Sequence, residues 1–182
     1  EWARNGRFIN GHIETCCVVA FNALRCDLLD ICTPEEQGQI LDYLEHSYYN
    51  AVLGYNSVSG RWCTYSTPMD GVRNTSVKEN GFQIRPGAPE LNCCSVNAPR
   101  GVGELIRWML RWEGENLYLN YFGASLLELE DGGRIKIEGD YPYSNQIRVH
   151  ITAGNRFRNL YLRLPGWSSQ TVISDSTGTR TV

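Results

Sequence analysis

The spacing of apolar residues changes near Gly114, and this change constrains the fold more than any other feature of the sequence. Before this glycine, apolar residues recur every three or four positions, which is typical of helices with one buried face. After it they alternate with polar residues, which is typical of half-buried strands. The sequence therefore predicts a helical segment, residues 1–113, followed by a β segment, residues 114–182.

The first predicted helix spans residues 14–31 and carries one apolar stripe along its length. Steps of three and four residues place the members of this stripe on a single face of the helix. They are Cys17, Phe21, Leu24, Leu28 and Ile31.

The second predicted helix has a clear start signal and a clear stop signal. Thr33 can cap it, Pro34 suits its first position, and Glu36 completes a capping box with Thr33. Gly54 is expected to end it. Its predicted buried face consists of Ile40, Leu41, Leu44, Tyr48, Ala51 and Val52.

The third predicted helix begins near Asn97 and ends at Gly114. The stretch that precedes it, residues 55–92, is rich in glycine and proline and has no regular pattern. A loop of this length inside a compact domain usually has a function, such as covering a pocket. We therefore expect residues 55–92 to lie close to a functional site.

The β segment contains several short alternating runs. Asp131, Gly132 and Gly133 separate two of them and predict a hairpin turn. Short strands at regular spacing indicate an antiparallel β-sandwich. The predicted strands lie at residues 116–121, 126–130, 134–138, 147–151 and 160–164.

Composition excludes two classes of partner. The net charge is −3, with 17 basic and 20 acidic residues and no basic stripe, which argues against nucleic acid. No apolar run reaches the roughly 20 residues that span a bilayer, so no membrane segment is predicted. The chain opens at Glu1 without an initiator Met, and we expect the natural protein to extend beyond both ends.

The seven cysteines indicate chemistry rather than a disulfide scaffold. Their number is odd, and two pairs are adjacent in sequence, Cys16-Cys17 and Cys93-Cys94. Adjacent cysteines seldom bridge each other, because the required geometry is strained. Metal binding or catalysis is the better explanation, and unbridged thiols favour a reducing compartment such as the cytoplasm.

Glu14 and Cys16 lie at the start of the first predicted helix, and Cys93 and Cys94 just before the third. Helix N-termini stabilise thiolates, and three thiolates with one carboxylate form a complete tetrahedral set for zinc. The alternative is that buried cysteines only fill space, as small apolar side chains do. We favour that alternative for Cys26, Cys32 and Cys63.

The order of these residues resembles glycoside hydrolase family 127, the β-L-arabinofuranosidases. The family's usual C-x-C-C-P reads Leu91-Asn92-Cys93-Cys94-Ser95 here, which leaves the exact sugar open. The matching stretches are Glu14-Thr15-Cys16, Leu44-Glu45, Tyr49-Asn50, Tyr65, Cys93-Cys94, Asn116-Leu117-Tyr118-Leu119-Asn120 and Leu162-Arg163-Leu164-Pro165-Gly166-Trp167.

The resemblance implies a fold: the C-terminal helices of an (α/α)₆ barrel, followed by the start of an antiparallel β-sandwich. It also implies a Zn²⁺ site and a sugar site. By the resemblance, Cys93 is the nucleophile and Glu1, the only acidic residue before Glu14, is the general acid/base. The implied zinc ligands are Glu14, Cys16, Cys93 and Cys94, and the implied sugar contacts are Glu45 and Tyr65.

Three functions remain open at this point. The first is a retaining glycosidase in which the zinc-bound thiolate of Cys93 attacks the sugar. The second is a closed, purely structural zinc site. The third is a carbohydrate-binding module that holds sugar on aromatic residues of the β segment.

The expected partners are a carbohydrate substrate and the rest of the parent chain. Exposed apolar stripes would also allow contacts with further copies of the chain. We expect the 182 residues alone to be inactive, because the resemblance places most walls of the pocket in missing helices. Without those helices, the stripes from Phe21 to Ile31 and from Ile40 to Val52 are expected to be exposed.

Overall fold

The computed structural model describes residues 12–68, 91–152 and 157–182, and it divides the chain into two compact units. The first unit is Glu1–Leu105 and the second is Ile106–Val182. Glu1 and most of the predicted loop 55–92 lie outside the described residues. None of the helices in the described part of the chain has the length and apolar character needed to span a membrane.

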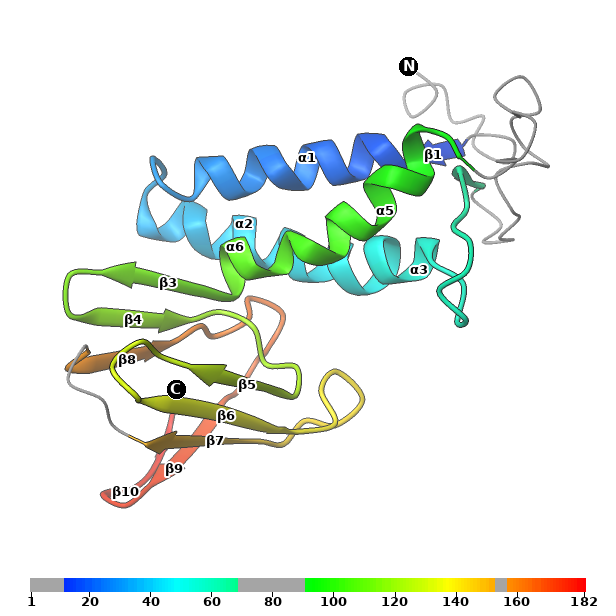
Figure 1. The fold of residues 1–182 in the computed structure, drawn as a ribbon. Helices are drawn as coiled ribbons and strands as arrows, with labels where there is room; N and C mark the ends of the chain where they lie inside the picture. The colour runs from blue at the N-terminus through cyan, green and yellow to red at the C-terminus, as the bar shows by residue number, and fades with distance from the viewer. Residues whose placement is uncertain (1–11, 69–90, 153–156) are drawn as a thin grey trace. The chain divides into compact units, whose positions relative to one another are not determined.

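Helices α1 and α5 pack against each other in the first unit, and α2 packs along α1 (Figure 1). Two short strands, β1 and β2, pair antiparallel beside the start of α1. Gly101 allows the close approach of α5, since a Cβ atom added there would lie 2.8 Å from Cγ2 of Val19 on α1. The elements are β1 (His12–Glu14), α1 (Thr15–Leu28), α2 (Pro34–Ser47), the π-helical η3 (Tyr48–Val52), α3 (Leu53–Tyr55), β2 (Ser66–Pro68), α5 (Cys93–Gly103) and α6 (Leu105–Met109), which crosses the unit boundary.

The predicted start of α2 is confirmed. Thr33 Oγ1 accepts a hydrogen bond from the backbone N–H of Glu36, and the Glu36 carboxylate accepts one from the backbone N–H of Thr33. The predicted end at Gly54 is wrong, because the helical path continues through η3 and α3 to Tyr55. Asn56 ends it instead, with an extended backbone and a side chain that donates to the carbonyl of Val52 at 3.0 Å.

The apolar stripe of α1 does not form its buried face. Phe21 is 52% exposed and Leu24 is 49% exposed, as expected for helices that lack further partners. The buried face lies to one side of the stripe and includes Asn22, whose side chain donates to Ser47 Oγ at 2.9 Å. The expected exposure of the second stripe is wrong, because α2 and η3 bury Leu41, Leu44, Tyr48 and Val52.

Helix α5 begins at Cys93, and the prediction of a start near Asn97 is wrong. The side chain of Asn92 caps the helix by accepting hydrogen bonds from the backbone N–H groups of Cys94 and Ser95, at 2.9 and 3.1 Å. The predicted end at Gly114 is also wrong, since residues 110–113 form strand β3.

The second unit contains two three-stranded sheets and a hairpin. The sheets have the orders β3-β4-β8 and β5-β6-β7, and β9 pairs with β10. Among the described strands of this unit the pairs are antiparallel, as expected, except β4 with β8, which is parallel and departs from the expectation. The strands are β3 (Leu110–Glu113), β4 (Asn116–Leu119), β5 (Ser125–Glu128), β6 (Arg134–Gly139), β7 (Ile147–Thr152), β8 (Asn159–Leu162), β9 (Val172–Asp175) and β10 (Gly178–Thr181).

The two sheets share one apolar core. Leu117 and Leu119 of β4 and Ile135 and Ile137 of β6 are fully buried together with Phe122. The predicted hairpin is confirmed: β5 and β6 pair across residues 129–133, where Gly132 has a φ of +83° that suits glycine. Helices followed by a β-sandwich are therefore as expected, whereas the barrel stays a prediction that this chain does not test.

Candidate metal centre

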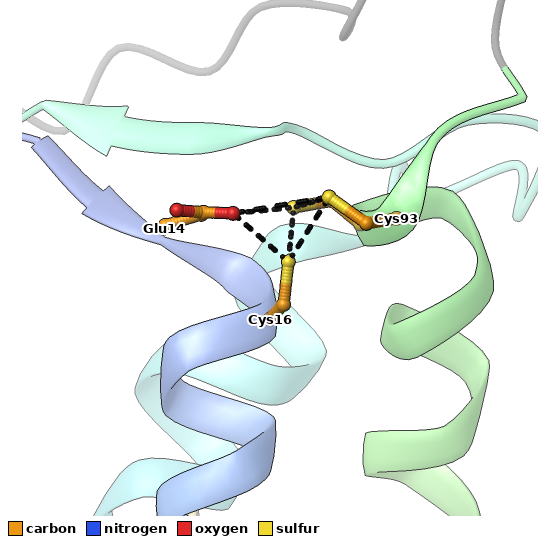
Figure 2. Close-up of side chains that lie close together, drawn as sticks. Glu14, Cys16 and Cys93 are labelled. Atoms are coloured by element: carbon orange, nitrogen blue, oxygen red, sulfur yellow. Dashed lines mark hydrogen bonds between the residues drawn. The ribbon is translucent and has the colours of Figure 1, made fainter.

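Two helix starts bring three thiols and one carboxylate to one point, as the sequence predicts. Glu14 occupies the N-cap position of α1 and Cys16 lies in its first turn. Cys93 and Cys94 are the first two residues of α5. One ligand atom from each of the four side chains lies within 4.8 Å of the others, and Figure 2 shows Glu14, Cys16 and Cys93 pointing toward one another.

Glu14, Cys16, Cys93 and Cys94 are together called here the Glu14–Cys94 cluster. The distances between their ligand atoms suit a small tetrahedral ion. Cys16 Sγ lies 3.0 Å from Cys94 Sγ and 3.3 Å from Cys93 Sγ, and Cys93 and Cys94 are 3.9 Å apart. Glu14 Oε1 lies 3.0 Å from Cys16 Sγ and 3.8–3.9 Å from the other two sulfurs. Zinc bonds of about 2.0–2.3 Å put tetrahedral ligand atoms about 3.3–3.8 Å apart, so the four residues fit zinc.

The thiols of the cluster differ in acidity. Burial raises the pKa of Cys94 to about 12, and burial together with the Glu14 hydrogen bond raises the pKa of Cys16 as well. Burial also acts to raise the pKa of Cys93, but hydrogen bonds with Tyr65, Cys16 and Cys94 outweigh it, and its pKa is lowered. Cys93 is therefore the first thiol to ionise, and a bound cation would favour ionisation of the other two.

The backbone supports negative charge at the cluster. Helices α1 and α5 both begin at the cluster, and the N–H groups of a helix's first turn favour anionic ligands. Thr15 holds one of these ends in place: its backbone N–H donates to the carbonyl of Tyr65 at 2.9 Å, and its buried hydroxyl donates to the carbonyl of Thr64 at 2.8 Å.

Tyr65 lies beside the cluster, with its hydroxyl oxygen 3.5 Å from Cys93 Sγ. The pKa of Tyr65 is raised, first by the hydrogen bond with Cys93 and then by burial. Cys93 is exposed whereas Cys94 is buried, so one thiol of the cluster faces outward and another faces the protein. Among the described residues, Cys93 is therefore the more accessible of the two adjacent thiols.

The other predicted site residues are placed as follows. Glu45 is buried in α2 and is not among the four residues whose ligand atoms meet. Cys26 and Cys63 are buried, Cys32 is half-buried, and no disulfide joins any of the seven cysteines.

Sequence reasoning missed the parts played by Cys17, Thr15 and Asn92. Cys17 is exposed, and its Sγ lies 3.8 Å from Glu14 Oε2, the oxygen that points away from the other thiols. The spacing of three residues between Glu14 and Cys17 at a helix start could have signalled this contact. The cap at Asn92 could have been found, since Asn before a helix start is a favoured N-cap residue.

Two family models match this chain. One is described as the catalytic domain of the GH127 β-L-arabinofuranosidases and matches residues 4–122. The other is described as the middle domain of the same enzymes and matches residues 116–181. No protein among the curated sequences matches significantly.

Solved structures show the same fold at low sequence identity. A GH127 β-L-arabinofuranosidase from Geobacillus stearothermophilus T6 is 18% identical with a TM-score of 0.62, over 96% of this chain. A GH127 β-arabinofuranosidase is 21% identical with a TM-score of 0.67, over 96% of this chain. A protein described as a glycoside hydrolase is 20% identical with a TM-score of 0.67, over 94% of this chain. This chain spans only 30% of the length of each of the three.

Proposed function

The chain belongs to the GH127 β-L-arabinofuranosidase family, and from this membership and the Glu14–Cys94 cluster we propose that the whole protein is a zinc-dependent retaining glycoside hydrolase. The observation that carries the proposal is the meeting of four ligand atoms within 4.8 Å at two helix starts. The proposed substrates are β-L-arabinofuranosides or related sugars of plant polysaccharides. Because the chain spans 30% of the matched structures, the activity is proposed for the whole protein.

Glu14, Cys16, Cys93 and Cys94 would hold the zinc ion. When bound, zinc supplies the positive charge that keeps several neighbouring thiols ionised at neutral pH. The chemistry of the donors supports zinc over magnesium or calcium, since thiolates are soft ligands and those two ions prefer oxygen. The exposure of Cys93 favours catalysis over a closed structural site.

Cys93 is the proposed nucleophile. Its thiolate attacks the anomeric carbon, a carbon–sulfur bond forms, and the bond to the leaving oxygen breaks. A carboxylic acid donates its proton to the departing oxygen. The resulting carboxylate then takes a proton from water as the water oxygen bonds to the anomeric carbon, the carbon–sulfur bond breaks, and the Cys93 thiolate is restored. Both displacements invert the anomeric carbon, so the overall reaction retains its configuration.

The remaining roles come from the family resemblance. Glu1 is proposed as the general acid/base, and Glu45 and Tyr65 as contacts to the sugar. The position of Tyr65 supports its part, because its hydroxyl lies 3.5 Å from the proposed nucleophile. We expect the 182-residue chain alone to lack activity, since the other walls of the pocket are proposed to come from the rest of the protein.

Hydrolysis of an aryl β-L-arabinofuranoside by the full-length protein tests the proposal. Cys93→Ser should abolish turnover, whereas Cys32→Ser should retain it, because Cys32 lies past the far end of α1 from the cluster. Intact-mass analysis after a brief reaction with a slow substrate should show one added sugar, absent in Cys93→Ser. Equal loss of activity in both variants, with no added mass in the unmodified protein, would contradict a cysteine nucleophile.

A further inference from the structure

One face of the β3-β4-β8 sheet carries side chains that its core does not use. Along each strand, alternate residues point into the core, including Trp112, Leu117 and Leu160. The residues between them point the opposite way. The register places them in two rows across the sheet: Arg111, Tyr118 and Tyr161 in one, and Glu113, Asn116 and Asn159 in the other, together called here the Tyr118–Tyr161 face.

The two tyrosines of this face form a stack. Their ring centroids are 4.8 Å apart and their planes differ by 15°. The parallel pairing of β4 with β8 places them directly opposite each other. Tyr118 is half-buried, whereas Tyr161 remains 46% exposed although one side of its ring is covered by Tyr118. The other side of the Tyr161 ring therefore faces away from the stack.

Polar groups beside the stack are held in place by short hydrogen bonds. The Tyr118 hydroxyl donates to Glu113 Oε2 at 2.9 Å, which fixes the inner ring. Asn159 Nδ2 donates to Asn116 Oδ1 at 3.0 Å, and the Asn116 side chain also hydrogen-bonds with the Tyr118 hydroxyl. The side-chain carbonyl of Asn159 can accept further hydrogen bonds. The face thus has one ring surface with an amide acceptor next to it.

Charge on the face is balanced, with one arginine, Arg111, and one glutamate, Glu113. At its border Arg158 and Glu115 form an exposed ion pair at 3.1 Å. A polyanion would require an excess of basic residues, and an apolar protein surface would offer no donor to the side-chain carbonyl of Asn159. The ligand that matches this face is uncharged, has many hydroxyl groups and presents a flat C–H surface.

We propose that the Tyr118–Tyr161 face binds an uncharged carbohydrate chain. One sugar ring packs its C–H groups against the negatively polarised outer surface of the Tyr161 ring. A hydroxyl group of the same or the next sugar donates to the side-chain carbonyl of Asn159. The face shares no residue with the Glu14–Cys94 cluster, so the inference goes beyond the proposed hydrolysis and stands or falls separately from it.

Native electrophoresis in gels with and without soluble arabinan or arabinoxylan tests the proposal on the full-length protein. The protein should migrate more slowly in at least one of the polysaccharide gels. Tyr161→Ala should weaken this binding by roughly tenfold, which corresponds to about 1.4 kcal/mol, whereas Tyr161→Phe should bind normally because stacking needs the ring alone. Tyr143→Ala is the matched control, since Tyr143 is at least as exposed but lies outside the face.

The outcomes separate this site from its rivals. Unchanged migration of the unmodified protein in both gels, or equal binding by Tyr161→Ala, would overturn the proposal. A change of oligomeric state in Tyr161→Ala on size-exclusion chromatography would instead identify the face as a contact between copies of the chain. If Tyr161→Ala unfolds at a lower temperature than the unmodified protein, Asn159→Ala replaces it as the test variant. Asn159→Ala should then bind the polysaccharide more weakly than the unmodified protein. Hydrolysis of a small aryl glycoside should be the same in all of these variants, so a failed active-site proposal would leave the gel result intact.

Discussion

The two units of the chain place their apolar residues differently. In the β unit, alternate residues of β4 and β6 close a core in which Leu117, Leu119, Ile135 and Ile137 are fully buried. In the helical unit, α1 buries Thr15 and Asn22 while Phe21 and Leu24 remain about half exposed. The buried face of α1 also includes Val19, Ala23 and Cys26, so it lies beside the predicted stripe and mixes polar with small apolar side chains.

This difference bears on how each unit is stabilised. The β unit has an apolar core of its own, which is the usual source of stability for a small domain. The helical unit also buries apolar side chains, among them Leu41, Leu44 and Val52, and it adds close helix contacts and the metal-ligand cluster at two helix ends. The exposed α1 stripe fits the expectation that further helices of the whole protein pack on it, and that expectation stays a prediction.

The largest expected effect comes from the β core. Leu119→Ala should lower the free energy of unfolding by about 2–5 kcal/mol, because a fully buried leucine leaves a cavity. Leu24→Ala on α1 should cost less than about 1 kcal/mol, because much of that side chain already contacts water. Urea unfolding followed separately for each unit measures both values. Similar losses would mean that the α1 stripe is covered in solution.

Metal removal should affect the helical unit and spare the β unit. Zinc at about 100 times its Kd would stabilise the helical unit by about 2.7 kcal/mol, and a chelator would remove this gain. Metal binding must displace protons from thiols such as Cys94, whose pKa is raised to about 12, so affinity should increase as pH rises from 6 to 8. Thermal melts with and without chelator measure the effect, which Cys94→Ser should lose. A chelator shift of the same size in Cys94→Ser would place the metal elsewhere.

Removal of the metal should also make the thiols of the cluster easier to oxidise. The sulfurs of Cys16 and Cys94 are 3.0 Å apart, so mild oxidation of the metal-free protein is expected to join them. The zinc-loaded protein should resist oxidation. Intact mass measures the difference, because the disulfide forms with the loss of two hydrogen atoms, whose electrons pass to the added oxidant.

The helical contacts depend on close approach, which a single methyl group should reveal. Gly101→Ala would place Cβ 2.8 Å from Val19 Cγ2 and 3.1 Å from Val52 Cγ1, and we expect a loss of about 1–3 kcal/mol. Gly103→Ala is the matched control two residues further along α5, where nothing lies within 4 Å of the added Cβ. It should be neutral or slightly stabilising, because alanine favours helix. A neutral result for Gly101→Ala would mean that α5 moves away from α1 without cost.

Local signals in the sequence were enough to predict the features that few neighbouring residues decide. The capping box of Thr33 and Glu36 and the turn at residues 131–133 depend only on nearby backbone geometry. The meeting of Glu14, Cys16, Cys93 and Cys94 was predicted from two sources together: both pairs lie near helix starts, where thiolates are stabilised, and the four residues match the family resemblance. Zinc binding and the individual roles stay proposals.

Features that depend on distant partners could not be predicted in this way. Strands β4 and β8 are far apart in sequence and pair in parallel. The alternation of apolar and polar residues is the same in parallel and antiparallel strands, so it could not show the direction of this pairing. The buried face of α1 was missed because Asn22 finds a partner in Ser47 on another helix. The early start of α5 was missed because proline is favoured in the first turn of a helix, so Pro99 indicated a helix start near Asn97. In the structure the helix begins at Cys93, and Pro99 lies inside it.

A smaller effect is expected at the cap of α5. Asn92→Ala should cost about 1 kcal/mol, because the N–H groups of Cys94 and Ser95 lose their acceptor, whereas Asn92→Gly should cost only a few tenths. Because the same turn carries Cys93 and Cys94, the alanine variant should also bind zinc more weakly. Asn50→Ala is a suitable control, since Asn50 donates to a helix carbonyl and caps nothing. Equal losses at Asn50 and Asn92 would contradict a capping role.

The smallest expected effect is a pH dependence at the start of α2. Hydrogen bonds from the backbone and then the side chain of Thr33 lower the pKa of Glu36 below its ordinary value of 4.5. A depressed carboxyl pKa contributes stability that is present above the ordinary value and is lost as pH falls through the value in the folded protein. Glu36→Gln should therefore melt slightly lower than the unmodified protein at pH 6 and at nearly the same temperature at pH 3. Glu35→Gln, in the same turn but outside the capping box, should show a weaker pH dependence of this difference. Melting curves between pH 3 and pH 6 that stay parallel for Glu36→Gln and the unmodified protein would show that the carboxylate of Glu36 adds nothing beyond what an amide supplies.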